Sequence, residues 1–101
     1  MDQTVIEKVK QYADIVRQTM NVKKIVLYGS YARGCEHDRS DIDVAVIVDG
    51  LEGDYLELSS RLFELVRKID VRIEPVLLDE TSDKSGFIES IMKYGKEINF
   101  N

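Results

Sequence analysis

Two aspartates stand at the start of the most apolar stretch of the chain, which begins Asp41-Ile42-Asp43-Val44 and runs to Val48. Short runs of β-branched residues are typical of buried strands, and aspartate is disfavoured inside them. Residues two apart in a strand lie on the same face, with backbones roughly 6.6 Å apart at a rise of about 3.3 Å per residue. The pattern therefore predicts a strand over residues 41–48 that carries two carboxylates on one face.

The rest of the chain alternates between helical and strand spacing of apolar residues. Helical spacing predicts helices over residues 3–20, 54–68 and about 85–94, and short apolar runs predict strands over residues 25–28 and 71–78. A short helical turn over residues 31–33, polar loops over 35–40 and 79–85, and a last extended piece around 98–100 complete the prediction. Tyr12 and Phe63 are expected in the core or an interface, and Tyr55 on the buried stripe of its helix.

Three strands with flanking helices favour an α/β or α+β sandwich, in which a small mixed sheet of three or more strands is flanked by helices. The long helices are expected to bury one face of the sheet. The other face, with Asp41 and Asp43, is then expected to meet solvent or a ligand. A length of 101 residues predicts a single domain over residues 1–101.

Composition narrows the class of function. No apolar run approaches the roughly 20 residues of a membrane span, and the N-terminus does not resemble a signal peptide. One cysteine and one histidine make a Cys/His zinc site implausible, and the lone cysteine fits a cytoplasmic protein. The net charge of −5 argues against a general nucleic-acid binder, which needs a basic face. Carboxylates can instead hold the metal ions of a bound nucleotide.

Gly29 and Ser30 lie between the predicted strand at 25–28 and the helical turn that follows it. Glycine lets a backbone approach a phosphate closely, and the N–H groups that open a helical turn attract anions. The Ser30 hydroxyl can add a donor to a phosphate oxygen. By itself the dipeptide is more typical of helix capping. Its proximity in sequence to Asp41 and Asp43 gives it weight, because two such carboxylates can bind the pair of Mg²⁺ ions that drives many displacements at phosphorus.

Together, Gly29-Ser30, Gly34 and Ser40-Asp41-Ile42-Asp43 resemble the nucleotidyltransferase signature of the DNA polymerase beta superfamily. The resemblance covers about residues 25–78 and is strongest to the minimal members, the MNT type. It implies that Gly29 and Ser30 hold the triphosphate of ATP or another NTP, and that Asp41 and Asp43 bind Mg²⁺, with two ions expected.

The resemblance also implies a third carboxylate on a later strand, as general base or metal ligand. Glu74 is the first candidate, although many minimal members carry aspartate there, and Pro75 hints at an edge strand or a bulge. Asp70, nearer the start of the strand, is the alternative. Arg33 can reach a phosphate or brace the loop, and Ser40 can bind nucleotide or, as favoured here, cap the turn before Asp41.

Three interpretations remain open from the sequence. In the first, the chain transfers a nucleoside monophosphate, AMP from ATP, to a hydroxyl acceptor. Minimal members are often antitoxins that add AMP to a tyrosine of an HEPN-type toxin, so the resemblance implies such a partner and allows a homodimer. In the second, the chain is an inactive nucleotide-binding or antitoxin module that acts by binding a partner. A purely structural acidic domain is the third and weakest interpretation. His37 and Cys35 are expected to be bystanders.

Overall fold

A four-stranded mixed sheet organises the chain, in the computed structural model that describes residues 3–29, 41–83 and 85–98. The strand order is β3-β2-β1-β4. The strands are β1 (Lys24–Tyr28), β2 (Ile42–Val48), β3 (Ile73–Asp79) and β4 (Lys96–Glu97); the helices are α1 (Gln3–Thr19), α3 (Tyr55–Val66) and α4 (Phe87–Tyr94), with a 3₁₀ turn η1 at Glu80–Ser82. The prediction of a small mixed sheet flanked by helices is confirmed.

The register of the sheet sets which side chains meet at its ends. Strands β1 and β2 are antiparallel and place Tyr28 opposite Asp43, whereas β2 and β3 are parallel and place Asp43 opposite Glu74. Strand β3 lies at the edge, where the missing N–H of Pro75 is tolerated. The strand begins at Ile73 rather than at residue 71, because a turn bonded from Ile73 N–H to Asp70 O precedes it.

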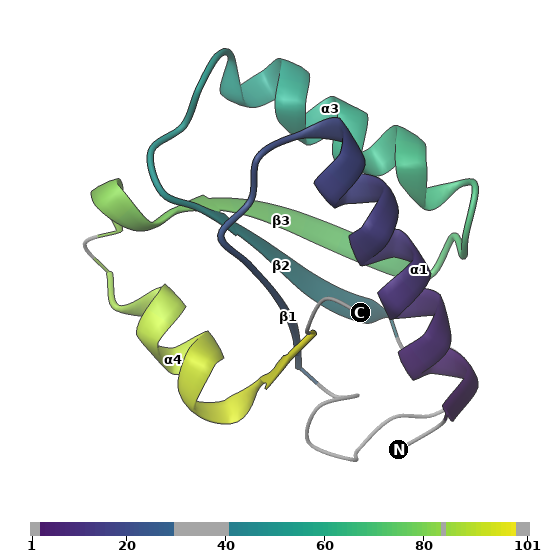
Figure 1. The fold of residues 1–101 in the computed structure, drawn as a ribbon. Coiled ribbons are helices and arrows are strands. Elements are labelled where there is room, and N and C mark those ends of the chain that lie inside the picture. The colour runs from purple at the N-terminus through teal and green to yellow at the C-terminus, as the bar shows by residue number, and fades with distance from the viewer. Residues whose placement is uncertain (1–2, 30–40, 84, 99–101) are drawn as a thin grey trace.

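Helices α1 and α3 cover one face of the sheet (Figure 1). Their apolar stripes bury Ile25 and Leu27 of β1 together with the matching residues of β2 and β3. Tyr12 is fully buried in this core, as expected, and its hydroxyl donates a 2.7 Å hydrogen bond to Leu62 O. Burial raises the pKa of Tyr12 far above its ordinary value, so it stays a neutral structural donor.

Helix α4 covers much of the other face, which the sequence predicted to be open (Figure 1). Its buried residues Ile88 and Ile91 pack against Val26, Ala45 and Ile47 in a second, smaller core. The helix was predicted, but its position on the sheet was not, because spacing along the chain does not say which face a helix will cover. The acid-bearing end of this face is more open: Asp43 is half-buried and Glu74 is exposed.

Two aromatic residues of α3 are exposed, Tyr55 against its predicted place on the buried stripe and Phe63 within its predicted alternatives of core or interface. Tyr55 is 46% exposed, because it begins the helix and no preceding turn lies beneath its side chain. Phe63 is 49% exposed and therefore is not a core residue. Leu56, one heptad earlier on the same helix, is 72% exposed. These two residues are the exposed helical stripe on which the predicted homodimer would rely, and the dimer itself stays a prediction.

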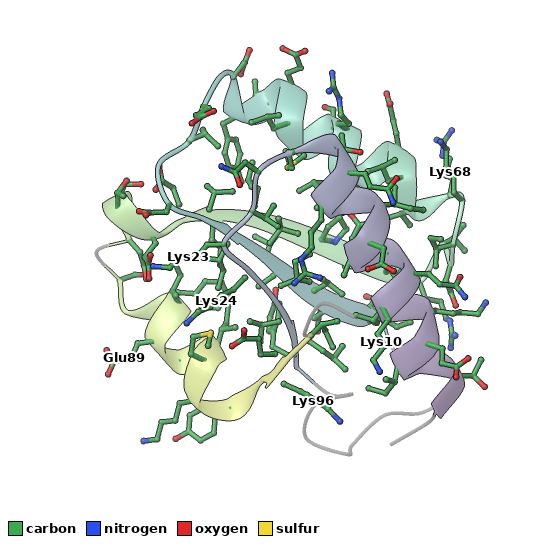
Figure 2. The ribbon with its side chains drawn as sticks, viewed as in Figure 1. Lys10, Lys23, Lys24, Lys68, Glu89 and Lys96 are labelled. Carbon is green, nitrogen blue, oxygen red and sulfur yellow. The ribbon has the colours of Figure 1, made fainter. Side chains whose placement is uncertain are left out.

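The short strand β4 returns the chain to the free edge of β1. It pairs antiparallel with β1 and sets Glu97 opposite Val26 and Lys96 opposite Leu27. Figure 2 shows Lys96 toward the end of β1, away from Lys23 and Lys24 at its beginning. An extended piece was predicted around residues 98–100; the structure instead has the strand at Lys96–Glu97, and residues 99 and 100 lie outside the described residues.

Candidate active site

Gly29 directly follows β1 and contacts Asp43 at one end of the sheet, which is called the acidic edge below. Its φ of +75° lies in the left-handed region that favours glycine. A Cβ built on Gly29 would overlap Oδ2 of Asp43 and lie 3.1 Å from its Cγ. Glycine is therefore required here by backbone conformation and by space, and the turn predicted to bind phosphate starts against the Asp43 carboxylate.

Asp43 and Glu74 are brought together by the parallel pairing of β2 and β3. They point to the same face as Ala45 and Val76, the face on which α4 packs. Neighbouring strands lie about 4.8 Å apart, so the two carboxyl groups can reach a common ion or a common substrate atom. The sequence alone could not tell how close Asp43 and Glu74 lie, whereas the strand register shows that they are neighbours.

Tyr28 completes this row across three strands, since it lies opposite Asp43 on β1. Its pKa is raised, first by burial of the phenol and then by the negative charges of Asp43 and Glu74. A shift from both carboxylates means that the end of β1 sits in their combined negative field. A divalent cation or a proton donor is favoured in such a field. The sequence interpretation assigned no role to Tyr28.

The other predicted site residues fall into two groups. Asp41 is described, lies just before β2 and is exposed. Ser30, Arg33 and Ser40 lie outside the described residues, as do the predicted bystanders His37 and Cys35. The assignments of these residues stay predictions.

Asp70, the alternative third acid, lies in the turn before β3 and is held by basic neighbours. The Arg72 guanidinium donates to both carboxylate oxygens, with Nη2 to Oδ2 at 2.8 Å, and Lys8 Nζ lies 3.5 Å from Oδ2. Hydrogen bonds from the Arg72 side chain are the main cause that lowers the pKa of Asp70 to about 2. Because these cations already neutralise its charge, Asp70 is a poor ligand for a metal ion.

The donor set fits Mg²⁺ as a partner of substrate phosphates. Within residues 3–29, 41–83 and 85–98, no three acidic, histidine or cysteine side chains converge closely enough to enclose an ion. Magnesium is usually held by one or two carboxylates, with phosphate oxygens and water completing the shell, so a full protein cage is not needed. Asp43 and Glu74 supply hard oxygen ligands in the negative field felt by Tyr28, with Asp41 two residues away.

A larger cavity lies elsewhere and contains none of the predicted site residues that the structure describes. Its volume is about 370 Å³, and it is lined by the segments around Asn21 and Gly50, with Val48 and Leu58. A smaller cavity of about 140 Å³ borders Gly29 and α4. Size alone would therefore have pointed away from the acidic edge.

The model of the polymerase beta nucleotidyltransferase family matches residues 7–100. The chain belongs to this family. It is accordingly an enzyme of the nucleotidyltransferase class, as the signature around Gly29 and Asp43 predicted. In the part of the nucleotidyltransferase that the structure describes, no helix is both long and apolar enough to cross a membrane.

Proteins similar to this nucleotidyltransferase include ones named as candidate protein adenylyltransferases and ones solved in toxin–antitoxin complexes. A Methanocaldococcus jannaschii protein, named as a candidate protein adenylyltransferase (MJ0141), is 29% identical over 93% of this chain and 98% of its own length. A toxin–antitoxin structure with AMP-PNP matches at a TM-score of 0.63 and 23% identity, covering 91% of this chain and 73% of that one. The complex of a tri-AMPylated Shewanella oneidensis HEPN toxin with its MNT antitoxin matches at 0.62 and 22%, covering 100% and 74%. The structural matches establish the fold.

Proposed function

We propose that this nucleotidyltransferase transfers AMP from Mg²⁺-bound ATP to a hydroxyl group of a partner protein, a tyrosine of an HEPN-type toxin. The observation that carries the proposal is the contact of Gly29 with Asp43, together with the pairing of Asp43 and Glu74, at one end of the sheet. The name of the M. jannaschii relative supports a protein acceptor, and the AMPylated toxin in the S. oneidensis complex supports the HEPN class.

In the proposed reaction, the acceptor oxygen attacks the α-phosphorus of ATP. A new bond forms between that oxygen and phosphorus, the bond to the bridging oxygen breaks, and pyrophosphate leaves. Glu74 accepts the proton of the acceptor hydroxyl or orients it toward phosphorus. Gly29 and Ser30 hold the triphosphate through backbone and hydroxyl donors, and Arg33 and Ser40 assist from the same segment.

Asp41 and Asp43 are assigned to hold Mg²⁺, with Glu74 as a further ligand. When bound, two such ions would neutralise phosphate charge and favour ionisation of the attacking hydroxyl. The half-buried position of Asp43 against Gly29 keeps its carboxylate close to the turn that is assigned to the triphosphate. Neither assignment depends on a second domain that binds the acceptor, because the partner protein supplies the acceptor hydroxyl.

The proposal is tested by incubating the purified chain with Mg²⁺, labelled ATP and a candidate HEPN-type partner protein captured with it from its own cells. The expected result is one or more added AMP groups on a tyrosine of the partner, seen by mass spectrometry and lost without Mg²⁺. If Mg²⁺–ATP binds and the partner binds, yet no adduct forms, the inactive antitoxin module replaces the enzyme. If no ribonucleotide binds with Mg²⁺, both proposals fail.

A further inference from the structure

A groove between α4 and the end of β1 opens beside the candidate site. It has a volume of about 140 Å³ and is lined by Tyr28, Gly29, Phe87, Ser90, Ile91 and Tyr94. Gly29 is shared with the predicted phosphate-binding turn, and Tyr28 with the row that contains Asp43. The groove and the acidic edge are therefore parts of one continuous surface.

The walls of this groove are aromatic. The Phe87 ring meets the Tyr28 ring edge-to-face, with centroids 6.0 Å apart and planes at 89°. Tyr94 lies two helical turns after Phe87 on the same side of α4, with the buried Ile91 between them. The charged side chain of Glu89 points away from the sheet on the other side of the helix (Figure 2). The helix thus turns its aromatic side chains toward the groove.

Phe87 is 42% exposed and Tyr94 is 63% exposed, although both belong to large apolar side-chain types. Exposed aromatic residues grouped at the edge of a catalytic site are typical of ligand contacts. Phe87, which meets Tyr28 edge-to-face and is itself partly exposed, provides a ring against which a flat group can stack. Stacking on aromatic side chains is how many proteins hold nucleobases without regard to sequence.

The groove is small and open to solvent. A volume of 140 Å³ is well below the roughly 300 Å³ at which pockets for whole ligands begin. It is close to the volume of about 150 Å³ that accepts a single benzene ring in another protein. A small groove that is open to solvent suits a flat group attached to a larger molecule that lies outside the groove.

We infer that this groove holds the base of the nucleotide whose triphosphate binds at the Gly29 turn, an inference that rests on the proposed function. The tyrosine ring of the acceptor is the other flat group in the reaction. Its hydroxyl must reach Glu74 on β3, which is two strands and about 10 Å from β1. Helix α4 makes its main sheet contact with β1, on the side of the triphosphate turn. The base therefore fits the groove better than the acceptor.

Calorimetry with two ligands separates the base from the phosphates. Mg²⁺–ATP and Mg²⁺–tripolyphosphate are titrated into the wild-type chain, Phe87→Ala, Tyr94→Ala and the control Phe63→Ala, whose ring is equally exposed but lies on α3. Phe87→Ala and Tyr94→Ala should each weaken ATP binding about tenfold, the scale of one lost stacking contact, and leave tripolyphosphate affinity unchanged. Phe63→Ala should change neither. Equal losses for both ligands, or no loss of ATP affinity, would overturn the inference.

A fluorescent reporter gives an independent reading, because the chain contains no tryptophan. Phe87→Trp keeps a flat ring at the groove, and Mg²⁺–ATP should quench its emission while Mg²⁺–tripolyphosphate should not. Quenching by a tyrosine-containing peptide instead of by ATP would assign the groove to the acceptor and overturn the inference. If the wild-type chain binds neither phosphate ligand, the proposed function itself fails; if it binds both and the variants do not discriminate, only the base groove fails.

Discussion

Asp43 of β2 and Glu74 of β3 face each other as register partners in the parallel half of the sheet. Two carboxylates on adjacent strands repel each other, and burial of the Tyr28 phenol, followed by both of these negative charges, raises the pKa of Tyr28. The same pairing gives two hard oxygen ligands at a fixed spacing. We therefore expect that removing one of these carboxylates weakens metal binding without lowering the stability of the metal-free fold.

Asp43→Asn tests this trade directly. The variant should weaken Mg²⁺-dependent ATP binding by at least about 10- to 100-fold and abolish transfer, since a ligand carboxylate is lost. Its melting temperature without metal should be unchanged or slightly raised, because repulsion from Glu74 is relieved. Asp14→Asn, which removes an exposed carboxylate from α1, is the matched control and should alter neither property. Full transfer by Asp43→Asn would refute the metal assignment.

Glu74→Gln addresses the base rather than the ligand set. Loss of a positioned base lowers rates by about 10²- to 10⁴-fold, so the turnover number should fall while ATP affinity, measured by calorimetry, changes far less. Asp70→Asn is the comparison variant. It should leave turnover unchanged, because Arg72 and Lys8 already hold that carboxylate. A loss of turnover in Asp70→Asn with none in Glu74→Gln would transfer the role to Asp70.

Much of the fold could be predicted because local patterns decide it. The spacing of apolar residues predicted the helices and central strands to within a few residues. Pro75 indicated the edge position that β3 occupies. The position of α4 over Ala45 and Ile47 could not be predicted, since it depends on which sheet face the other helices leave open. The sequence left Phe63 open between core and interface for the same reason, and its exposure excludes the core.

Site residues that are neighbours in the sequence could be predicted, whereas those that strand pairing brings together could not. Asp41 and Asp43 stood out because acids are rare in an apolar strand. The meeting of Tyr28, Asp43 and Glu74 requires two strand pairings of opposite direction, which no spacing along the chain encodes. Phe87 and Tyr94 were assigned no site role because aromatic residues at helical spacing usually belong to a core.

Asp70 makes folding stability depend on pH in the acid range. Its pKa of about 2 in the folded chain is below the ordinary value of 3.8, so the ion pair stabilises the fold above about pH 4. This contribution is lost as the pH falls from about 4 toward 2. The full shift would be worth roughly 2.5 kcal/mol, and solvent around the partly exposed Arg72 and Lys8 reduces it to about 1–2 kcal/mol.

Urea unfolding of the wild-type chain and Asp70→Asn at pH 7 and pH 2.5 measures this contribution. The asparagine keeps an oxygen for the Arg72 N–H, so the variant removes mainly the charge. The free-energy difference between the two chains should be about 1–2 kcal/mol at pH 7 and small at pH 2.5. A difference of the same size at both pH values would show that packing, not ionisation, is the cause.

Gly29→Ala and Gly50→Ala separate backbone strain from steric overlap at the site. Both glycines have positive φ, at +75° and +88°, so alanine at either position should cost about 1–2 kcal/mol of stability. A Cβ at Gly50 would meet no atom within 4 Å, whereas a Cβ at Gly29 would overlap the Asp43 carboxylate. Gly29→Ala should therefore cost about 1–3 kcal/mol more than Gly50→Ala in urea unfolding.

The second half of this test moves the overlapping group. In an Asp43→Ala background the carboxylate is gone, and the cost of Gly29→Ala should fall to that of Gly50→Ala. Gly29→Ala in the wild-type background should also weaken Mg²⁺–ATP binding, because the Asp43 side chain must move away from the turn to make room. Equal costs for the two glycine variants, with ATP affinity unchanged, would mean that Gly29 and Asp43 are not in contact in solution.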